Sequence, residues 1–279
     1  MKLFGVTTTY NCSKLVPYVM KYAERLGYDK LIVYDNESTD DTVEKLKKYP
    51  FVEIRTFHTG HFCEAEKLRV KYEAVGELQK QCGGEFVWCT TCDFDEVYYF
   101  NGCVLSFKEY LCFLTRLGYN VCTENLKMVL SRNENHDENL LLHETSEKIS
   151  YQTPFIWNKP ILFRLDTLRK LRYAPGQHYA DIEFYDSSAK QVYNTKSLSA
   201  FHLKFSFGIE YMERYSRELS ERGCQTTKND KPTDIYIDGK VREEFEREYA
   251  CGVSPTDFLT YKTLNGNDDY EHLPPIQYY

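Results

Sequence analysis

The first hundred residues alternate between short apolar runs and amphipathic stretches. Val16, Val19 and Ala23 recur at helical spacing between two apolar, β-prone runs. The elements predicted in this half are strands at 3–9, 30–34, 52–57 and 85–92, and helices at 15–26, about 38–48 and 65–81. The β-α-β-α-β order is typical of a parallel sheet with right-handed crossovers, and such sheets bind ligands at the carboxyl ends of their strands.

The second half of the sequence does not continue this alternation of strands and helices. The elements predicted there are helices at 106–117, 207–222 and 241–249 and strands at 120–130 and 161–165, with a polar excursion at 132–150 and a loop-like end beyond 264. No linker or repeat separates the two halves. We therefore expect one α/β domain, a mostly parallel sheet flanked by helices, with further helices toward its C-terminus.

Composition places the chain among compact, acidic proteins. Its 279 residues carry a formal charge of −7, and 42% of them are hydrophobic. Nucleic-acid binding is not expected, because it requires clustered Lys and Arg, which are scattered here. No apolar run approaches the roughly 20 residues that span a bilayer, and residues 1–6 lack a signal-peptide layout, so we expect a cytoplasmic protein.

Cysteine and tyrosine are both numerous, with 10 and 24 copies. In a reducing cytosol the cysteines are expected to be small buried hydrophobes. Cys89 and Cys92 have zinc-knuckle spacing, but no second pair follows, so a structural role is favoured. Tyrosine offers a flat apolar face and a hydroxyl, which suit sugar rings as well as protein cores.

Two predicted strands end in carboxylates. Asp35 directly follows the second strand, and an acidic cluster at 93–96 follows the fourth. Asp93 and Asp95 point to the same side of an extended segment and repel each other unless a cation lies near them. Mg²⁺ or Mn²⁺ bridging a diphosphate suits such oxygen ligands. An acidic surface turn is less favoured, because residues 86–88 before the cluster are apolar.

The loop after Asp35 permits more than one interpretation. Asp35, Glu37 and Thr39 alternate as EF-hand ligands do. The pattern then fails, because Asp40 stands where that loop needs Gly and Leu46 where it needs Glu. A helix cap in the same loop is compatible with ligand binding. We expect Asp35 to accept hydrogen bonds from a ribose or a base.

These stretches resemble a known family. Residues 35–42 read Asp-Asn-Glu-Ser-Thr-Asp-Asp-Thr and resemble the Asp-Asn-x-Ser-x-Asp-x-Thr element of family 2 glycosyltransferases, which adopt the GT-A fold. Residues 92–96 look like their Asp-x-Asp element, in the form that continues with Glu and aromatic residues. Residues 201–206 resemble, more weakly, the C-terminal His-Tyr-x-x-x-Ser segment of a family-2-like branch. The resemblance covers about 1–220.

The resemblance implies a Rossmann-like GT-A glycosyltransferase domain at 1–222. Its nucleotide-binding half would be 1–100 and its acceptor half 101–222. Residues 223–279 are then expected to form a C-terminal extension of helix and loop that packs on the same domain.

In GT-A enzymes the nucleotide lies against the first strand end and the strand-tip Asp. By resemblance, Thr7, Thr8 and Asn11 would flank the uracil or other base. Asp35 would bond the base or its ribose, and Asn36 would add a loop group beside it.

The resemblance also implies a metal site. Asp93 would face the ribose or a metal-bound water, and Asp95 would ligate Mn²⁺ or Mg²⁺. A later His commonly completes the metal shell, for which His202 is the first choice and His178, in a Gly-containing loop, its rival. The apolar neighbours of His202 are also typical of a core residue.

Lys67 and Lys204 are the candidates for contacts with a diphosphate. Lys67 follows a loop at 58–64 that is expected to lie over the nucleotide, although its composition also suits a metal. Lys204 lies within the 201–206 motif. A solvated surface position is the alternative for both lysines.

Inverting transfer needs a carboxylate to take the proton of the acceptor hydroxyl while the metal stabilises the leaving nucleoside diphosphate. Family 2 enzymes often place this base in a Glu-Asp pair, and no clean pair of that kind occurs here. Asp181 is the first choice for the base, followed by Asp137, Glu138 and Glu144.

The sequence therefore predicts a metal-dependent glycosyltransferase of the hexosyltransferase type. It would move a sugar from a nucleoside diphosphate sugar, with UDP favoured, to a glycan, lipid-linked or other hydroxyl acceptor. Inversion is implied by the resemblance alone. The sequence lacks the Gln-x-x-Arg-Trp motif of processive synthases, so a non-processive enzyme of polysaccharide biosynthesis is expected, with peripheral association at the inner membrane face left open.

Two other functions match parts of this pattern. A sugar nucleotidylyltransferase uses a related sheet, but residues 7–11 lack its Gly-rich, basic triphosphate loop. A non-catalytic sugar- or nucleotide-binding module is the other alternative, and the intact Asp93 and Asp95 weigh against it.

Overall fold

The computed structural model describes most of the chain. The described residues are 1–60, 63–102, 105–150, 158–173, 180–193, 195–222, 226–228, 231–233 and 240–259. The end beyond residue 264, predicted as loop, and His178, predicted as a rival metal ligand, both lie outside these ranges.

The first half of the chain forms the strand and helix alternation that the sequence predicts. Four strands pair in parallel, in the order β3-β2-β1-β4. These strands and the helices between them are β1 Lys2–Thr9, α1 Val16–Leu26, β2 Lys30–Asp35, α2 Thr42–Leu46, β3 Val52–Thr56, α3 Glu64–Lys80 and β4 Val87–Thr91. Parallel pairing brings the carboxyl ends of the four strands to one edge of the sheet.

The second half extends the same sheet with mixed pairing. From β4 the order continues as β8-β6-β12-β5, and β7 and β11 also pair with β6. The elements are β5 Glu96–Phe100, α4 Phe107–Arg116, β6 Tyr119–Leu130, α5 Leu142–Thr145, β7 Lys148–Ile149, β8 Asn158–Arg164, β9 Leu168–Tyr173, β10 Ala180–Phe184, β11 Lys190–Tyr193, β12 Leu198–Phe205, α6 Gly208–Glu221, β13 Thr226–Lys228, β14 Lys231–Thr233 and α7 Lys240–Cys251. The predicted α/β class, with a helix-flanked sheet and C-terminal helices, is confirmed.

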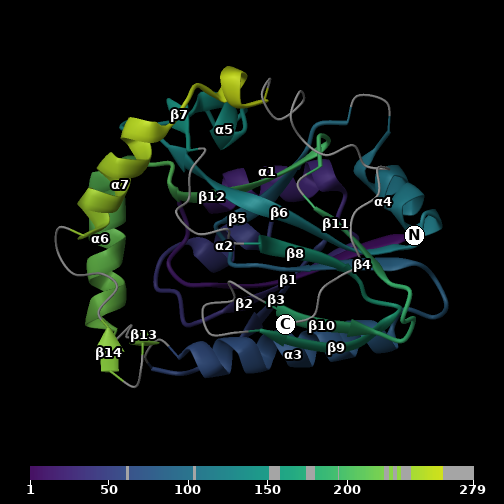
Figure 1. Cartoon of the computed structure of the whole chain (residues 1–279). Helices are drawn as coiled ribbons and strands as arrows, with labels where there is room; N and C mark the ends of the chain where they lie inside the picture. The colour runs from purple at the N-terminus through teal and green to yellow at the C-terminus, as the bar shows by residue number, and fades with distance from the viewer. Residues whose placement is uncertain are drawn as a thin grey trace.

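Helices cover both faces of the sheet (Figure 1). On one face, α1 and α4 pack over the buried side chains of Leu3 and Trp88. On the other face, Val70, Ala74 and Val75 of α3 form a core with the sheet and the β9–β10 hairpin. Helix α6 stands across the edge at which β1 and β2 end (Figure 1). This placement puts α6 opposite the strand tips that carry the acidic motifs.

Helix α2 is shorter than the sequence predicts. It begins at Thr42, whereas the sequence predicts a helix from about residue 38. The backbone N–H of Asn11 donates to the Ser38 hydroxyl (2.9 Å), and the N–H of Thr42 donates to Asp40 Oδ1 (3.0 Å). These short polar side chains bond to the loops around them, which delays the start of the helix.

The eight described cysteines are free thiols, and four of them are buried. Burial raises the pKa of Cys12 to about 11, so this thiol is protonated at neutral pH. Within the described ranges, no helix combines the length and apolar character needed to cross a bilayer.

His143 of α5 gives the core a specific sensitivity to acid. Its ring stacks on Phe201 (4.7 Å between centroids), its Nδ1 lies 2.7 Å from the Tyr22 hydroxyl, and burial lowers its pKa from 6.5 to about 3. The unfolded chain therefore takes up a proton near pH 6.5 that the folded protein takes up only near pH 3. Stability is present above pH 6.5 and falls as the pH drops, by roughly 1.4 kcal/mol per unit.

Between pH 6.5 and 4.5 this group is expected to cost roughly 2–3 kcal/mol of unfolding free energy. Urea denaturation at both pH values measures the loss. In His143→Asn, whose amide oxygen can replace Nδ1 as the partner of Tyr22, the slope against pH should fall by about one proton. An unchanged slope in that variant would contradict the assignment.

Candidate active site

The ends of β1, β2 and β3 place three polar residues side by side. Thr9 pairs with Asp35, and Asp35 pairs with Thr56, in the parallel register of these strands. Only 4% of the Asp35 surface is exposed, and its Oδ2 accepts a hydrogen bond from the N–H of Ser38 (3.0 Å). The aspartate predicted to bind the nucleoside therefore lies at a strand tip and also orders the loop that follows.

Several buried oxygens at this edge have no hydrogen-bond partner within the described part of the chain. They include Asp35 Oδ1 and the hydroxyls of Thr7 and Thr9. Residues two apart on a strand share a face, and Asp35 lies in register with Thr9, so these three groups lie on the same side of the sheet. Buried polar atoms without partners are rare, which marks this position as one where a bound group would satisfy them.

Two residues in the neighbouring loops have left-handed backbone conformations. Asn11 has a φ of 45° and Glu37 a φ of 62°. The side chain of Asn11 accepts a hydrogen bond from the N–H of Thr39 (2.8 Å) and donates to Glu218 of α6 (3.3 Å). Such conformations cost free energy in non-glycine residues and cluster at functional sites.

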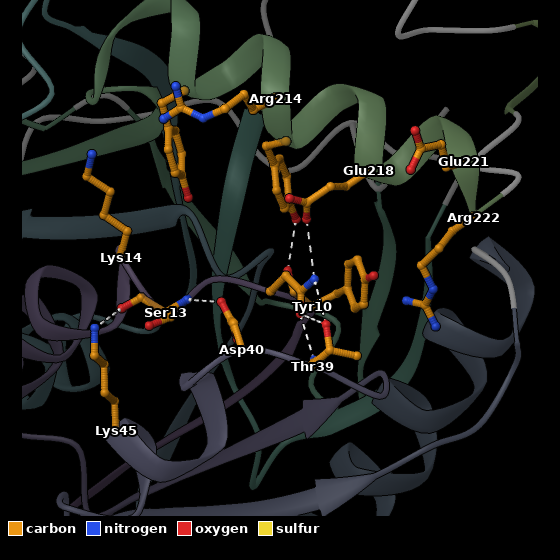
Figure 2. Close-up of a pocket in the computed structure, with 13 residues that line it drawn as sticks. Tyr10, Ser13, Lys14, Thr39, Asp40, Lys45, Arg214, Glu218, Glu221 and Arg222 are labelled. Carbon is orange, nitrogen blue, oxygen red and sulfur yellow. Dashed lines mark hydrogen bonds between the residues drawn. The ribbon is translucent and has the colours of Figure 1, made fainter.

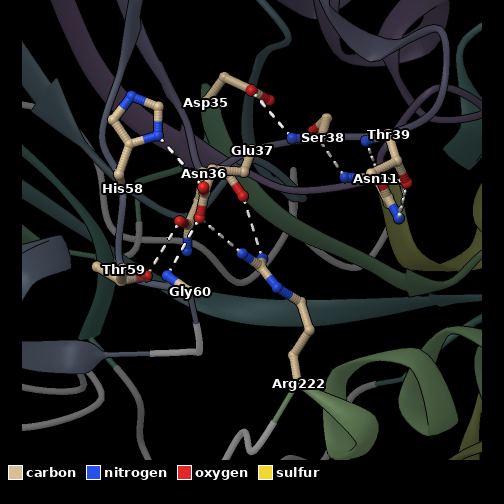
Figure 3. Close-up of polar contacts among 10 residues, drawn as sticks. All are labelled: Asn11, Asp35, Asn36, Glu37, Ser38, Thr39, His58, Thr59, Gly60 and Arg222. Carbon is tan, nitrogen blue, oxygen red and sulfur yellow. Dashed lines mark hydrogen bonds and ion pairs between the residues drawn. The ribbon is translucent and has the colours of Figure 1, made fainter.

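Glu37 joins three segments of the chain (Figure 3). Its carboxylate accepts a hydrogen bond from the N–H of Gly60 (3.1 Å), which is the main cause of its lowered pKa, and it pairs with Arg222 (3.3 Å). Arg222 also donates to the carbonyl oxygen of Asn36 (3.0 Å), and its guanidinium lies over the Tyr10 ring, 3.9 Å from the centroid. The end of α6 is thus tied directly to the loops after β2 and β3.

Asp93, at the end of β4, is held by two lysines of α3. Lys67 Nζ lies 2.8 Å and Lys71 Nζ 3.1 Å from its Oδ1. The Lys71 side chain has no exposed surface and also donates to the carbonyl oxygen of Cys92 (2.9 Å). Burial alone would lower the pKa of Lys67, but the nearby carboxylates of Asp93 and Glu64 outweigh it and raise that pKa. Asp93 is therefore neutralised by the protein itself.

Asp95 faces a different partner. In the antiparallel pairing of β5 with β12, His202 lies opposite Glu96, and the N–H of Leu203 donates to the backbone oxygen of Asp95 (2.7 Å). This register puts His202 Nε2 3.0 Å from Asp95 Oδ2. Burial disfavours both charged forms, but the mutual attraction outweighs it, so the pKa of Asp95 is lowered and that of His202 is raised.

Asp95 and His202 could provide two protein ligands for a divalent metal. Within the described ranges, no group of three or more His, Cys, Asp or Glu side chains is arranged to hold a metal ion. Mg²⁺ commonly binds through one or two carboxylates together with substrate phosphates and water. The donor set present here, one carboxylate and one imidazole nitrogen 3.0 Å apart, fits a metal that arrives with a diphosphate.

The other residues predicted to contact the sugar-nucleotide donor do not all lie at the strand tips. Asn36 lies in the strand-tip loop, where its side-chain oxygen accepts a hydrogen bond from the Thr59 hydroxyl (3.1 Å). Thr8 is buried within β1. Lys204 pairs with Glu244 of α7 (2.7 Å) rather than lying among the acidic motifs. Its contact with a diphosphate stays a prediction.

Three of the four carboxylates predicted as candidates for the base have local partners. Asp181 pairs with Lys170 across the β9–β10 hairpin (2.8 Å). Glu144 and Asp137 accept hydrogen bonds from backbone N–H groups two or three residues away. Within the described part of the chain, none of the contacts of these carboxylates involves Asp95. Their assignment as the base stays a prediction.

Sequence reasoning missed several residues of this site. Lys71 carried a usable signal, because it falls on the apolar stripe of α3 together with Val75 and Leu78, where a lysine needs a buried partner. Arg222 and Glu37 carried no comparable signal. Their contact joins positions 185 residues apart, and no local sequence pattern predicts it.

No protein-family model matches the sequence, and no curated protein matches it. Among solved structures, 4-diphosphocytidyl-2C-methyl-D-erythritol synthase from Anaerococcus prevotii shares 13% identity, over 59% of this chain and 71% of that chain, with a TM-score of 0.29. Glucosyl-3-phosphoglycerate synthase from Mycobacterium tuberculosis, in complex with Mn²⁺, UDP-glucose and phosphoglyceric acid, shares 14% identity, over 63% and 62%, with a TM-score of 0.33. Similarity at this level assigns neither a family nor an activity to the chain.

Proposed function

We propose that this protein is a metal-dependent glycosyltransferase of the GT-A type, which transfers a sugar from a nucleoside diphosphate sugar to a hydroxyl acceptor. The observation that carries the proposal is the convergence of Asp95 and His202, 3.0 Å apart, at the sheet edge that also carries Asp35. One end of this edge suits a nucleoside and the other suits a metal-bound diphosphate. UDP is the favoured nucleotide, Mn²⁺ or Mg²⁺ the metal, and the transfer is non-processive.

Each group at this edge has a proposed task. Asp35, with the unpartnered hydroxyls of Thr7 and Thr9, accepts hydrogen bonds from the nucleoside. Asp95 and His202 hold the metal, which when bound stabilises the charge of the leaving nucleoside diphosphate. Asp93 orients Lys67 at the same edge, so that this lysine faces the phosphates while remaining charged.

Ligand-dependent stabilisation tests this proposal. Thermal unfolding is measured with UDP, GDP and dTDP, each with Mn²⁺ and with EDTA. At a hundred times Kd, a ligand that binds only the folded state adds about 2.7 kcal/mol, which for a chain of this length raises Tm by roughly 5 °C or more. We expect the largest rise with UDP and Mn²⁺, and little with UDP and EDTA.

A matched pair of variants locates the effect. Asp35→Asn keeps an oxygen for the N–H of Ser38 but removes the charge, and it should abolish most of the rise. Asp186→Asn, at an exposed turn after β10, should keep it. If no nucleotide stabilises the protein under any condition, the proposed function is wrong.

A further inference from the structure

A cavity of about 720 Å³ lies between α6 and the loops after β1 and β2 (Figure 2). Asn11 belongs both to its wall and to the strand-tip loops, where it bonds to Thr39 on one side and to Glu218 on the other. The cavity therefore opens beside the proposed nucleoside end of the site. Its volume is within the range of small-ligand pockets.

Three tyrosines line this cavity. Tyr10 follows β1, and Tyr211 and Tyr215 are one turn apart on α6. The rings of the two helix residues are parallel within 1°, with centroids 6.4 Å apart, and the Tyr215 hydroxyl donates to the backbone oxygen of Tyr10 (3.1 Å). Aromatic rings held in this way offer flat apolar faces next to polar groups. That combination matches the C–H faces and hydroxyls of a sugar.

Cationic and acidic side chains nearly balance around the cavity. Four lining residues are cationic and three are acidic: Lys14, Lys45, Arg214 and Arg222 against Asp40, Glu218 and Glu221. Figure 2 shows them on both walls, from the loops and from α6. A diphosphate that binds without a metal needs an excess of cationic side chains, which these lining residues do not provide. A neutral polyhydroxyl ligand uses both kinds of group, because every hydroxyl donates and accepts.

The existing contacts leave capacity for such a ligand. Lys14 and Arg214 share a single carboxylate, Glu134, at 3.2 and 3.0 Å, and both also lie over the Tyr211 ring, 5.1 and 6.0 Å from its centroid, so a sugar on that face has to displace them. Glu218 accepts one long hydrogen bond, from Asn11 Nδ2 at 3.3 Å. These three charged groups retain hydrogen-bonding positions that can turn toward a ligand hydroxyl.

The cavity and the proposed metal end are joined through one hydrophobic core. Tyr211 and Tyr215 pack against the core that also contains Phe94 and Val97, the residues on either side of Asp95 and Glu96. An acceptor has to lie near Asp95 if the donor diphosphate is held by Asp95 and His202.

We propose that this cavity is the acceptor subsite and that it binds a neutral carbohydrate against the rings of Tyr211 and Tyr215. The proposal rests on the proposed function, because it names the acceptor of that reaction. It adds a substrate class, a sugar with free hydroxyls, and a set of residues from α6 that the acidic motifs do not include.

Two measurements on the full-length protein test the subsite. In the first, saturation-transfer NMR is recorded with methyl glycosides of glucose, galactose, mannose and N-acetylglucosamine, without any donor. In the second, the KM for the glycoside with the strongest signal is measured with UDP-glucose and Mn²⁺, alongside the Kd of UDP with Mn²⁺ by calorimetry. We expect saturation transfer to at least one glycoside.

Tyr211→Ala should lose that signal and raise the acceptor KM at least tenfold, while its Kd for UDP stays within twofold. Tyr185→Ala removes a tyrosine that is 76% exposed on the β9–β10 hairpin side, and it should keep both values. Far-ultraviolet circular dichroism and urea denaturation show whether each variant is folded. Tyr211→Phe serves if the alanine variant unfolds, because it keeps the ring and should keep the glycoside signal.

The outcomes separate the two proposals. A glycoside signal that persists in Tyr211→Ala, or the absence of any signal in the wild type, would overturn the acceptor subsite. A parallel loss of UDP affinity in Tyr211→Ala would also overturn it, because the cavity would then hold the donor. A glycoside signal that depends on Tyr211 in a protein that binds no nucleotide would support the carbohydrate site while excluding the proposed transferase.

Discussion

Asp95→Asn is expected to lower metal-dependent turnover of the sugar-nucleotide donor by about 10³-fold, with the fold retained. A factor of 10³ corresponds to about 4 kcal/mol in the activation free energy, which is the scale of a lost ligand to a metal that stabilises a leaving group. Folding should be affected less than turnover, because Asn keeps a side-chain oxygen that can face His202 and the hydrogen bond from Leu203 uses the backbone oxygen of Asp95.

Turnover is measured as kcat/KM for release of UDP from UDP-glucose with Mn²⁺. The free energy of unfolding is measured by urea denaturation. Asp186→Asn is the matched control, since it makes the same chemical change at an exposed turn. Turnover at the wild-type level in Asp95→Asn would remove Asp95 from the metal site. A loss of both turnover and stability would instead assign it a structural role.

The fold of the first half could be predicted because its information is local. Three of the four strands there are short apolar runs and β3 alternates apolar with polar residues, the longer helices have one apolar stripe, and the strand order is typical of right-handed crossovers. The second half could not be predicted in the same way. Strands β5, β9, β10, β11 and β12 were not expected as strands. Residues 96–100 become a strand by pairing with 198–205, which pair in turn with β6, and these partners lie far apart in the sequence.

The residues of the candidate site also divide into those that local sequence predicts and those that depend on distant parts of the chain. Asp35, Asp93 and Asp95 could be placed at the sheet edge from sequence, because Asp35 and the 93–96 cluster each directly follow a predicted strand. Their partners could not. Lys71 reaches Asp93 from the buried face of α3, and His202 reaches Asp95 only because β12 runs antiparallel to β5. The proposed acceptor subsite depends on α6, whose contacts with the strand tips join residues about two hundred positions apart.

These partners separate two carboxylates that the motif presents as equivalent. Asp95 has a partly exposed side chain that faces one imidazole, and its proposed role is to bind a metal. Asp93 faces two lysines, one of them without any exposed surface. It therefore stabilises the folded protein before any ligand binds. Replacing Asp95 should therefore mainly lower turnover, whereas replacing Asp93 should mainly lower the stability of the protein.

Asp93→Ala is accordingly expected to destabilise the protein by about 3 kcal/mol at pH 7. Removing one partner of a buried ion pair leaves an uncompensated charge and typically costs 3–5 kcal/mol, and the partial exposure of Asp93 favours the lower end of that range. The double variant Asp93→Ala with Lys71→Met should recover much of the loss, because it also removes the buried ammonium group. Urea denaturation of the wild type, both single variants and the double variant gives the coupling energy directly. A cost below about 1 kcal/mol for Asp93→Ala, or no recovery in the double variant, would show that Lys71 does not depend on this carboxylate.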